Sequence, residues 1–90
     1  MTTARRYVIA GQVQGVGFRW FTHDAAARAG VHGWVRNLAD GSVEVFVEGD
    51  VESVDRLEAA LRRGPAAARV ERITTEEHAP TGRAAGFEIR

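Results

Sequence analysis

The sequence predicts an α+β fold in which two helices cover one face of an antiparallel sheet. Two observations lead to this prediction. Segments in which apolar residues alternate, as they do in strands, occur at the beginning, in the middle and near the end of the chain. Two longer segments with apolar residues at helical spacing lie between them. The 90 residues contain no linker or internal repeat, so we expect one domain, residues 1–90, with one core.

The first strand is predicted over Arg6–Ala10, where apolar residues on both faces indicate an interior position in the sheet. A glycine-rich loop, Gly11–Gly17, follows this strand. The spacing then predicts a helix over Phe18–Ala29, which Gly30 ends. The apolar residues that define the expected buried face of this helix are Phe18, Phe21, Ala25 and Ala29.

A hairpin comes next, with strands over 31–38 and 42–48 and a turn at Asp40-Gly41. The second of these strands has an alternating pattern, in which valines occupy every other position. Because alternation is typical of a half-buried strand, Glu44 and Glu48 are expected on a solvent-exposed face.

Asp50 is the expected N-cap of a second helix, which reaches Arg63 and stops before Gly64-Pro65. Its apolar face consists of Val51, Val54, Leu57 and Leu61. Ion pairs at i, i+4 spacing are expected on the surfaces of the two helices. The three pairs with this spacing are Asp24–Arg28, Glu52–Arg56 and Glu58–Arg62.

Two further strands, Arg69–Thr75 and a short C-terminal strand Phe87–Ile89, complete the order. The order βαββαβ, with one strand added, predicts a ferredoxin-like sandwich. This fold is used by enzymes, metal carriers and RNA-binding modules, so it does not decide the function.

The charge balance argues against one class of partner. Twelve arginines balance twelve acidic residues, and the chain has no lysine. We therefore expect no bulk electrostatic binding of nucleic acid or of an anionic membrane. The absence of cysteine excludes disulfide and thiol chemistry. No apolar run approaches the roughly 18 residues of a membrane span, and no signal-peptide pattern is present, so we expect a cytoplasmic protein.

The glycine-rich loop is the most informative segment. Its glycines allow the backbone to approach a ligand closely, and its N–H groups, with those that open the helix, can form a cradle for an anion. Arg19 lies at the helix start, where the helix dipole disfavours a cation. Its guanidinium matches two oxygens of a phosphate. A phosphate-binding loop and a flexible loop with a surface arginine are the two interpretations.

Two commoner phosphate motifs are absent. A P-loop ends in Gly-Lys-Ser/Thr, whereas Gly17 is followed here by Phe18 and Arg19. The dinucleotide fingerprint needs a third glycine, and Trp20 stands in its place. ATP and NAD binding are therefore unsupported.

Asn37 is the second candidate for a functional residue. Asparagine is unfavourable in a strand, yet this one ends an apolar run. A side-chain amide can both donate to and accept from one water molecule. The alternative is that Asn37 only begins the turn that leads to Gly41.

Other chemistry-bearing residues have simpler interpretations. The three histidines lack the spacing of metal ligands, and no clustered carboxylate joins them, so no metal site is expected. The two tryptophans, Trp20 and Trp34, are expected to be packing residues. The histidines concerned are His23, His32 and His78.

Two motifs together resemble the signatures of acylphosphatases. The segment Gly11–Arg19, GQVQGVGFR, is similar to the first signature, and Gly33–Glu44, GWVRNLADGSVE, is similar to the second. Their spacing, the chain length and the element order also fit. The resemblance therefore covers essentially the whole chain.

The resemblance implies hydrolysis of a small-molecule acyl phosphate to a carboxylate and inorganic phosphate, without metal or cofactor. It implies that Arg19 binds the phosphoryl group and that Asn37 orients the attacking water. One departure is Gln12, at a place where such loops often carry Lys or Arg, so one positive charge is missing. Nothing in the sequence demands more than a monomer. The backbone N–H groups implied to share phosphate binding belong to Gly15, Val16, Gly17 and Phe18.

Three alternatives stay open. Acylphosphatase-like domains occur in larger carbamoyl-transfer maturation proteins, which carry extra zinc-binding and catalytic regions, whereas this sequence ends at Arg90. A ferredoxin-like RNA-binding module would need exposed aromatics on central strands and a basic sheet face, and Tyr7 and Phe46 are the only candidates. A relative that binds but has lost turnover is disfavoured by the presence of both Arg19 and Asn37.

Overall fold

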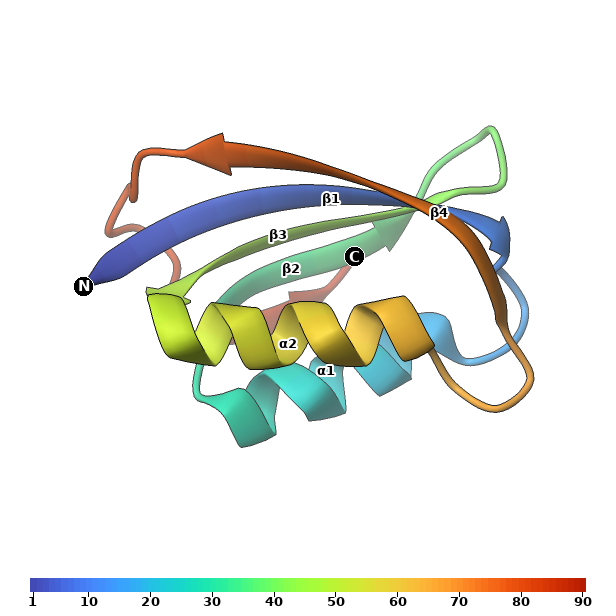
Figure 1. The fold of residues 1–90 in the computed structure, drawn as a ribbon, viewed down its shortest axis with the longest axis horizontal. Coiled ribbons are helices and arrows are strands. Elements are labelled where there is room, and N and C mark those ends of the chain that lie inside the picture. Colours follow the sequence, from blue (N-terminus) through green and yellow to red (C-terminus); the bar gives the residue numbers. More distant parts are fainter.

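Five strands form one sheet, and two helices cover one of its faces (Figure 1). The computed structural model describes all 90 residues. The predicted ferredoxin-like α+β fold is confirmed. The elements in chain order are β1 Thr2–Gln12, α1 Phe18–Ala29, β2 His32–Asn37, β3 Val43–Asp50, α2 Val51–Arg63, β4 Arg69–His78 and β5 Phe87–Ile89. Neither helix is long and apolar enough to cross a membrane.

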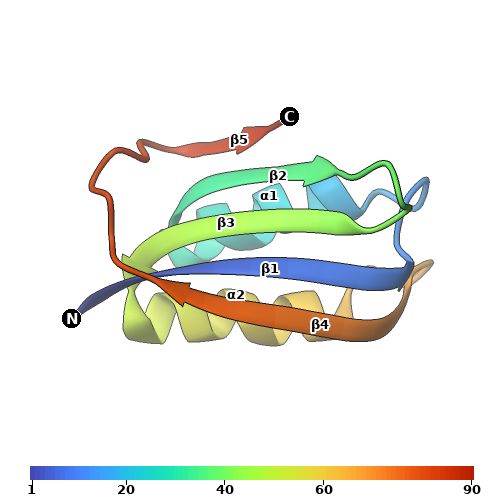
Figure 2. The same cartoon turned by 90° about the horizontal axis from the view of Figure 1, so that it is seen from above.

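The strands are arranged in the order β4-β1-β3-β2-β5 (Figure 2). The four main strands are antiparallel, as predicted. In Figure 2 the chain leaves the end of β4 and passes the ends of the other strands to reach β5. Because of this path β5 runs parallel to β2, and the complete sheet is mixed.

Strands β1 and β4 are longer than the sequence analysis predicted. β1 begins at Thr2 because this residue already pairs with Asp50 of β3. β4 extends to His78 because this residue pairs with Ala4. Asp50 occupies the predicted N-cap position of α2, but its side chain makes no capping hydrogen bond. Its carboxylate accepts instead from the amino group of Met1, at 3.0 Å.

The core lies between the sheet and the helices and consists of thirteen buried residues. The apolar face of α2 is confirmed at Val54, Leu57 and Leu61. The face predicted for α1 is confirmed at Phe18, and Ala25 and Ala29 pack against the core. It is wrong at Phe21, because the helix is rotated so that Thr22 lies at the centre of the buried side. Thr22 tolerates burial because its hydroxyl donates to the carbonyl of Phe18 at 2.8 Å. The buried residues of α1 are Phe18, Thr22 and Ala26.

The predicted surface ion pairs form in one case of three. Glu58 and Arg62 of α2 are 3.1 Å apart. Arg56 donates to the hydroxyl of Ser53 instead of meeting Glu52. Asp24 lies 3.4 Å from the ring of His23, and its predicted pair with Arg28 is absent. Exposed pairs of this kind contribute little to stability, so neighbouring groups readily replace them.

The exposed positions predicted for Glu44 and Glu48 are wrong, since both side chains are buried on the sheet face opposite the helices. Glu44 accepts hydrogen bonds from the Nε atoms of Arg6 and Arg36, each at 2.5 Å. Glu48 is covered by the chain between β4 and β5 and accepts from the backbone of Thr81 at 3.0 Å. Alternation in a strand identifies two faces, but it does not show what covers each of them.

The buried carboxylates of Glu44 and Glu48 make the stability of the fold depend on pH. Burial acts to raise the pKa of Glu44 and of Glu48, but hydrogen bonds to arginines and to Thr81 outweigh it and hold both pKa values below the ordinary 4.5. A carboxyl group whose pKa is lower in the folded state stabilises the fold at pH values above its pKa in the unfolded state. This stabilisation is lost as the pH falls through its pKa in the folded state. We therefore expect the melting temperature to fall steeply below pH 4.5.

Thermal unfolding followed by circular dichroism between pH 7 and pH 2 measures this dependence. The Glu48→Gln variant should show a shallower fall over the acid range because one linked group is gone. Glu71→Gln, at an exposed position of β4, is the matched control and should follow the wild type. Identical slopes for all three proteins would contradict the prediction.

Candidate active site

The loop between β1 and α1 begins at an irregularity in the sheet. The pairing of β1 with β4 shifts register between Ala10 and Gly11. A Cβ atom on Gly11 would lie 2.1 Å from the carbonyl oxygen of Arg69, so only glycine allows the two backbones to approach so closely here. After the shift, Gly11 and Gln12 still pair with Val70 and Arg69, and the chain then leaves the sheet for α1.

Two further glycines shape the loop itself. Gly15 and Gly17 have φ values of 74° and 80°, in the left-handed region that other residues adopt only with strain. A Cβ atom at either position would meet nothing within 4 Å. Glycine is therefore needed at both positions for the backbone conformation, and the space in front of them is open to a ligand.

The N-terminus of α1 is free to receive an anion. Gly17 is its N-cap residue, no side chain caps the helix, and its first turn contains no acidic residue. The N–H groups of the first turn have no acceptor within the helix. Together with the helix dipole, these groups favour an anion at this end.

A cavity of about 80 Å³ lies in front of this loop and brings most of the predicted site residues together. This volume corresponds to about two to three water molecules, at about 30 Å³ each. Val16 does not line the cavity, and its side chain packs against the core. Gln12 also lies outside, on β1 opposite Arg69. The lining residues are Val13, Gly15, Gly17, Phe18, Arg19, Trp20 and Asn37.

Arg19 is half-buried, and one of its guanidinium nitrogens is hydrogen-bonded within the protein. Its Nη1 donates to the carbonyl oxygen of Arg90 at 3.2 Å, and the backbone N–H of Arg90 in turn donates to Val35 of β2 at 2.8 Å. The end of the chain thereby orients the guanidinium at the cavity. The remaining donors of this group are available to a ligand.

Asn37 is the last residue of β2 and is exposed at the cavity. The turn that follows is held by other groups. The carboxylate of Asp40 accepts from the backbone N–H of Ser42 at 2.9 Å, and the N–H of Leu38 donates to the carbonyl of Ser42 at 2.8 Å. These bonds leave the side-chain amide of Asn37 free to contact a ligand or a water molecule.

Gln14 is a site residue that the sequence analysis missed. Its amide nitrogen donates to the carbonyl oxygens of Leu38 at 2.8 Å and of Ser42 at 2.9 Å. These two acceptors flank the turn after Asn37, so one side chain ties the glycine loop to the hairpin. A polar residue in the middle of a glycine-rich motif was the only signal for this role.

Of the two tryptophans that were predicted to be packing residues, Trp20 departs from the prediction and Trp34 does not. Trp20 is 66% exposed at the edge of the cavity, so it is not a packing residue. Trp34 contacts Phe46, on the sheet face that the helices leave open. Tyr7, a candidate for RNA stacking, is fully buried and donates to Glu58 at 2.9 Å. No group of three or more His, Asp or Glu side chains is arranged to hold a metal ion.

Comparison with known proteins identifies the family. Residues 5–89 match the family model described as Acylphosphatase. The chain belongs to the acylphosphatase family. An acylphosphatase of Koribacter versatilis (strain Ellin345) is 47% identical to it over 94% of this chain and 77% of that protein. The resemblance of the two sequence motifs is thus confirmed.

Solved structures share the acylphosphatase fold of this chain. The crystal structure of acylphosphatase from Bacillus subtilis has a TM-score of 0.94 at 32% identity and covers 100% of this chain and 99% of its own. HypF from T. kodakarensis has a TM-score of 0.85 at 34% identity. The match covers 98% of this acylphosphatase chain but only 12% of HypF.

Proposed function

We propose that this acylphosphatase hydrolyses acyl phosphates to a carboxylate and inorganic phosphate, with Arg19 and Asn37 as its catalytic residues. Family membership supports the reaction. The residue roles are supported by one observation above all, the shared cavity in which Arg19 and Asn37 meet the glycine loop. Its small volume suits a phosphoryl group and one water molecule.

The loop and Arg19 bind the phosphoryl group in this proposal. Backbone N–H groups from Gly15 to Phe18, including that of Val16, point donors at its oxygens, and Arg19 adds a bidentate contact. The charge of a transferring phosphoryl group lies on its three equatorial oxygens, so positioning and charge stabilisation do most of the catalysis. The leaving group is a carboxylate of low pKa, so it needs no proton donor.

Asn37 positions the nucleophile. Its free amide can accept from the attacking water and donate to it, which fixes the direction of attack. The cavity is lined by neither histidine nor carboxylate. We propose that an oxygen of the substrate phosphate takes the proton of the water. A flat rate profile between pH 5 and pH 8 is expected, whereas a protein base would give a step at its own pKa.

Hydrolysis of a simple aromatic acyl phosphate tests the proposed function directly. The purified protein should release one inorganic phosphate per benzoyl phosphate consumed, faster than the spontaneous reaction. A rate equal to that of the buffer alone would overturn the proposal and favour a relative that binds phosphate without turnover.

Activity should not depend on a metal ion. Dialysis against a strong chelator is expected to leave kcat unchanged, because the bound charge is balanced by Arg19 and by backbone dipoles. Phosphate release before and after dialysis, with and without added zinc or magnesium, measures this. Loss of activity that only a metal restores would contradict the prediction.

The last part of the proposal concerns the domain organisation, the oligomeric state, the location and the partners of the protein. We propose that residues 1–90 act as one acylphosphatase-like domain, monomeric and cytoplasmic, on a small-molecule substrate. The net charge of zero supports the absence of a nucleic-acid or membrane partner.

Gln14 should matter for turnover as a positioning residue. Gln14→Met keeps the volume of the side chain and removes both hydrogen bonds to the hairpin, so Asn37 is held less firmly against the loop. We expect kcat to fall by about tenfold, since displacements of about 1 Å are costly in a positioned site. The melting temperature should also fall, by the equivalent of about 1–2 kcal/mol.

Gln12→Met is the matched control, because Gln12 is exposed, lies outside the cavity and is the last residue of β1. It should leave kcat nearly unchanged. A Gln14→Met protein with normal kcat and a lower melting temperature would reduce Gln14 to a structural residue.

A further inference from the structure

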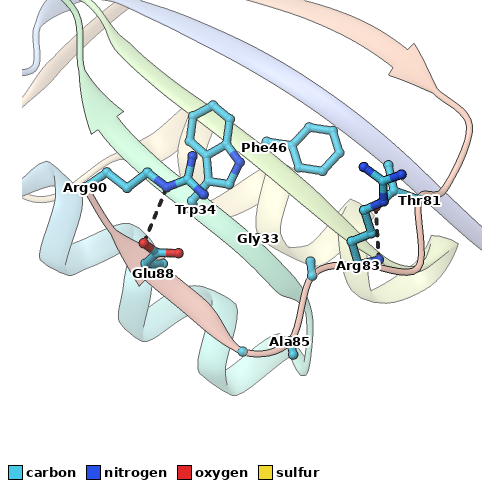
Figure 3. Close-up of a pocket in the computed structure, with 10 residues that line it drawn as sticks. Gly33, Trp34, Phe46, Thr81, Arg83, Ala85, Glu88 and Arg90 are labelled. Atoms are coloured by element: carbon cyan, nitrogen blue, oxygen red, sulfur yellow. Dashed lines mark hydrogen bonds and ion pairs between the residues drawn. The ribbon is translucent and has the colours of Figure 1, made fainter.

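The largest cavity of the molecule, about 330 Å³, is separate from the candidate active site. It is a groove on the sheet face opposite the helices, between the strands and the C-terminal segment (Figure 3). Trp34 of β2 and Phe46 of β3 form its floor, and the chain from Thr81 to Arg90 forms its wall. Its volume lies in the range of small-molecule sites, whereas that of the active-site cavity does not.

The floor is a flat aromatic surface. Trp34 and Phe46 are directly paired across β2 and β3, with ring centroids 6.0 Å apart and planes 22° from parallel. This separation is that of rings offset side by side. The ring of His78 of β4 lies 6.2 Å from that of Phe46 but at 66° to it, so it meets Phe46 edge-on and does not extend the flat surface. Because guanidinium groups lie over the Trp34 ring, the ring of Phe46 is the main surface on which a ligand could stack.

Two arginines, Arg83 and Arg90, line the groove, and Arg36 lies beside it on Trp34. The guanidinium of Arg90 lies 4.7 Å from the centre of the Trp34 ring, and that of Arg36 lies 5.3 Å from it. Figure 3 shows Arg90 over Trp34 at one end and Arg83 near Phe46 at the other. Arg83 is exposed, and its side chain forms no ion pair within the protein. Glu88, 3.5 Å from Arg90, is the single acidic residue of the lining.

The wall of the groove is fixed at both ends. The buried carboxylate of Glu48 accepts from the backbone N–H groups of Thr81 and Gly82, at 3.0 and 3.1 Å. At the other end, the N–H of Gly86 donates to Nδ1 of His32 at 2.7 Å. The groove is therefore largely formed before a ligand binds, which lowers the entropic cost of binding.

We propose that this groove binds a purine mononucleotide. The purine would lie on Phe46 and the adjoining edge of Trp34, because base–aromatic stacking needs only exposed ring faces. Its phosphate would pair with Arg83, whose planar donors suit phosphate oxygens and have no other partner. A longer nucleic acid fits less well, because the floor holds one base and the chain has no net charge.

Isothermal titration calorimetry of AMP into the full chain tests the proposal. Saturating inorganic phosphate keeps the active-site loop occupied. We expect one site with a dissociation constant of about 1 mM or lower. Adenosine, which lacks the phosphate, and ribose 5-phosphate, which lacks the base, should each bind at least about fivefold more weakly, because each loses one of the two contacts.

Variants locate the site. Arg83→Gln should weaken AMP binding by about fivefold, and its fold should be intact because the side chain has no partner to lose. Arg63→Gln removes the same charge from an exposed position of α2, on the other side of the sheet, and should change nothing. Phe46→Ala should weaken binding by about tenfold or more, with its folded state checked by circular dichroism.

Several outcomes would overturn the proposal. One is the absence of binding at millimolar AMP. Another is binding that is lost in Arg19→Ala, which would place AMP in the active site. Equal affinities for the wild type and Arg83→Gln would also reject it. Oligoadenylate binding a hundredfold more tightly than AMP would indicate a nucleic-acid surface instead. Retention of AMP binding in Arg19→Ala supports the groove whether or not the proposed catalytic function holds.

Discussion

Replacing Arg19 with alanine is expected to lower kcat by at least about 10²–10³-fold, the loss measured when one donor to a developing charge is removed. Substrate and inorganic phosphate should also bind more weakly, because the bidentate clamp is gone. Arg19→Lys should be nearly as inactive, since a compact ammonium group cannot hold two oxygens in one plane. Initial rates with benzoyl phosphate, and inhibition of these rates by phosphate, measure both effects.

Stability provides the control for Arg19. Its only hydrogen bond within the protein is the partly exposed one to the carbonyl of Arg90, so the melting temperature should change little. Arg28→Ala, an exposed position on the same helix, should keep full activity. An Arg19→Lys protein with near-normal kcat/KM would show that the bidentate clamp is not needed.

Asn37→Ala should lower kcat steeply, by about 10²-fold or more, while KM stays almost unchanged. This pattern arises when an interaction forms in the transition state and not in the ground state. Inhibition by inorganic phosphate gives an independent reading. It should survive in Asn37→Ala and weaken in Arg19→Ala, because Arg19 contacts the bound phosphate and Asn37 does not.

The competing interpretation, in which Asn37 only starts a turn, makes a different prediction. The variant would lose about 1 kcal/mol of stability, but its folded fraction would turn over normally. The structure disfavours this interpretation, because Asp40 holds the turn through Ser42. Melting temperature, kcat and phosphate inhibition measured on one preparation separate the two cases. A less stable but fully active protein would leave the attacking water without a partner.

Local signals predicted the helices better than the strands. The bounds of α1 agree with the sequence prediction at both ends. Among the strands, only the bounds of β5 do so. For α1 this succeeds because a glycine in the left-handed region stands on each side of the helix, at Gly17 and Gly30. Strand ends depend on the partner strand, which the sequence does not reveal. The extension of β4 to His78 follows from its pairing with Ala4, far away in the chain.

The candidate site was predictable where chemistry and backbone geometry share one motif. Arg19 and Asn37 became candidates because each residue type is unfavourable in its local element, but their roles were implied only by the resemblance to the acylphosphatase motifs. The cavity brings the two side chains together. Gln14 was missed because its partners are backbone carbonyls, which leave no trace in side-chain identity. The burial of Glu48 was missed for a similar reason, since a distant segment covers it.

The position of β1 at the centre of the sheet has a consequence for how quickly the chain reaches its native state. β1 pairs on one side with β3 and on the other with β4, whose residues 69–78 are among the last in the sequence. The contacts of the first strand are therefore mostly non-local, and closing such long loops slows folding. On the ribosome, β1 must wait until β4 has emerged, so we expect the domain to complete its fold late, in a slow and concerted step.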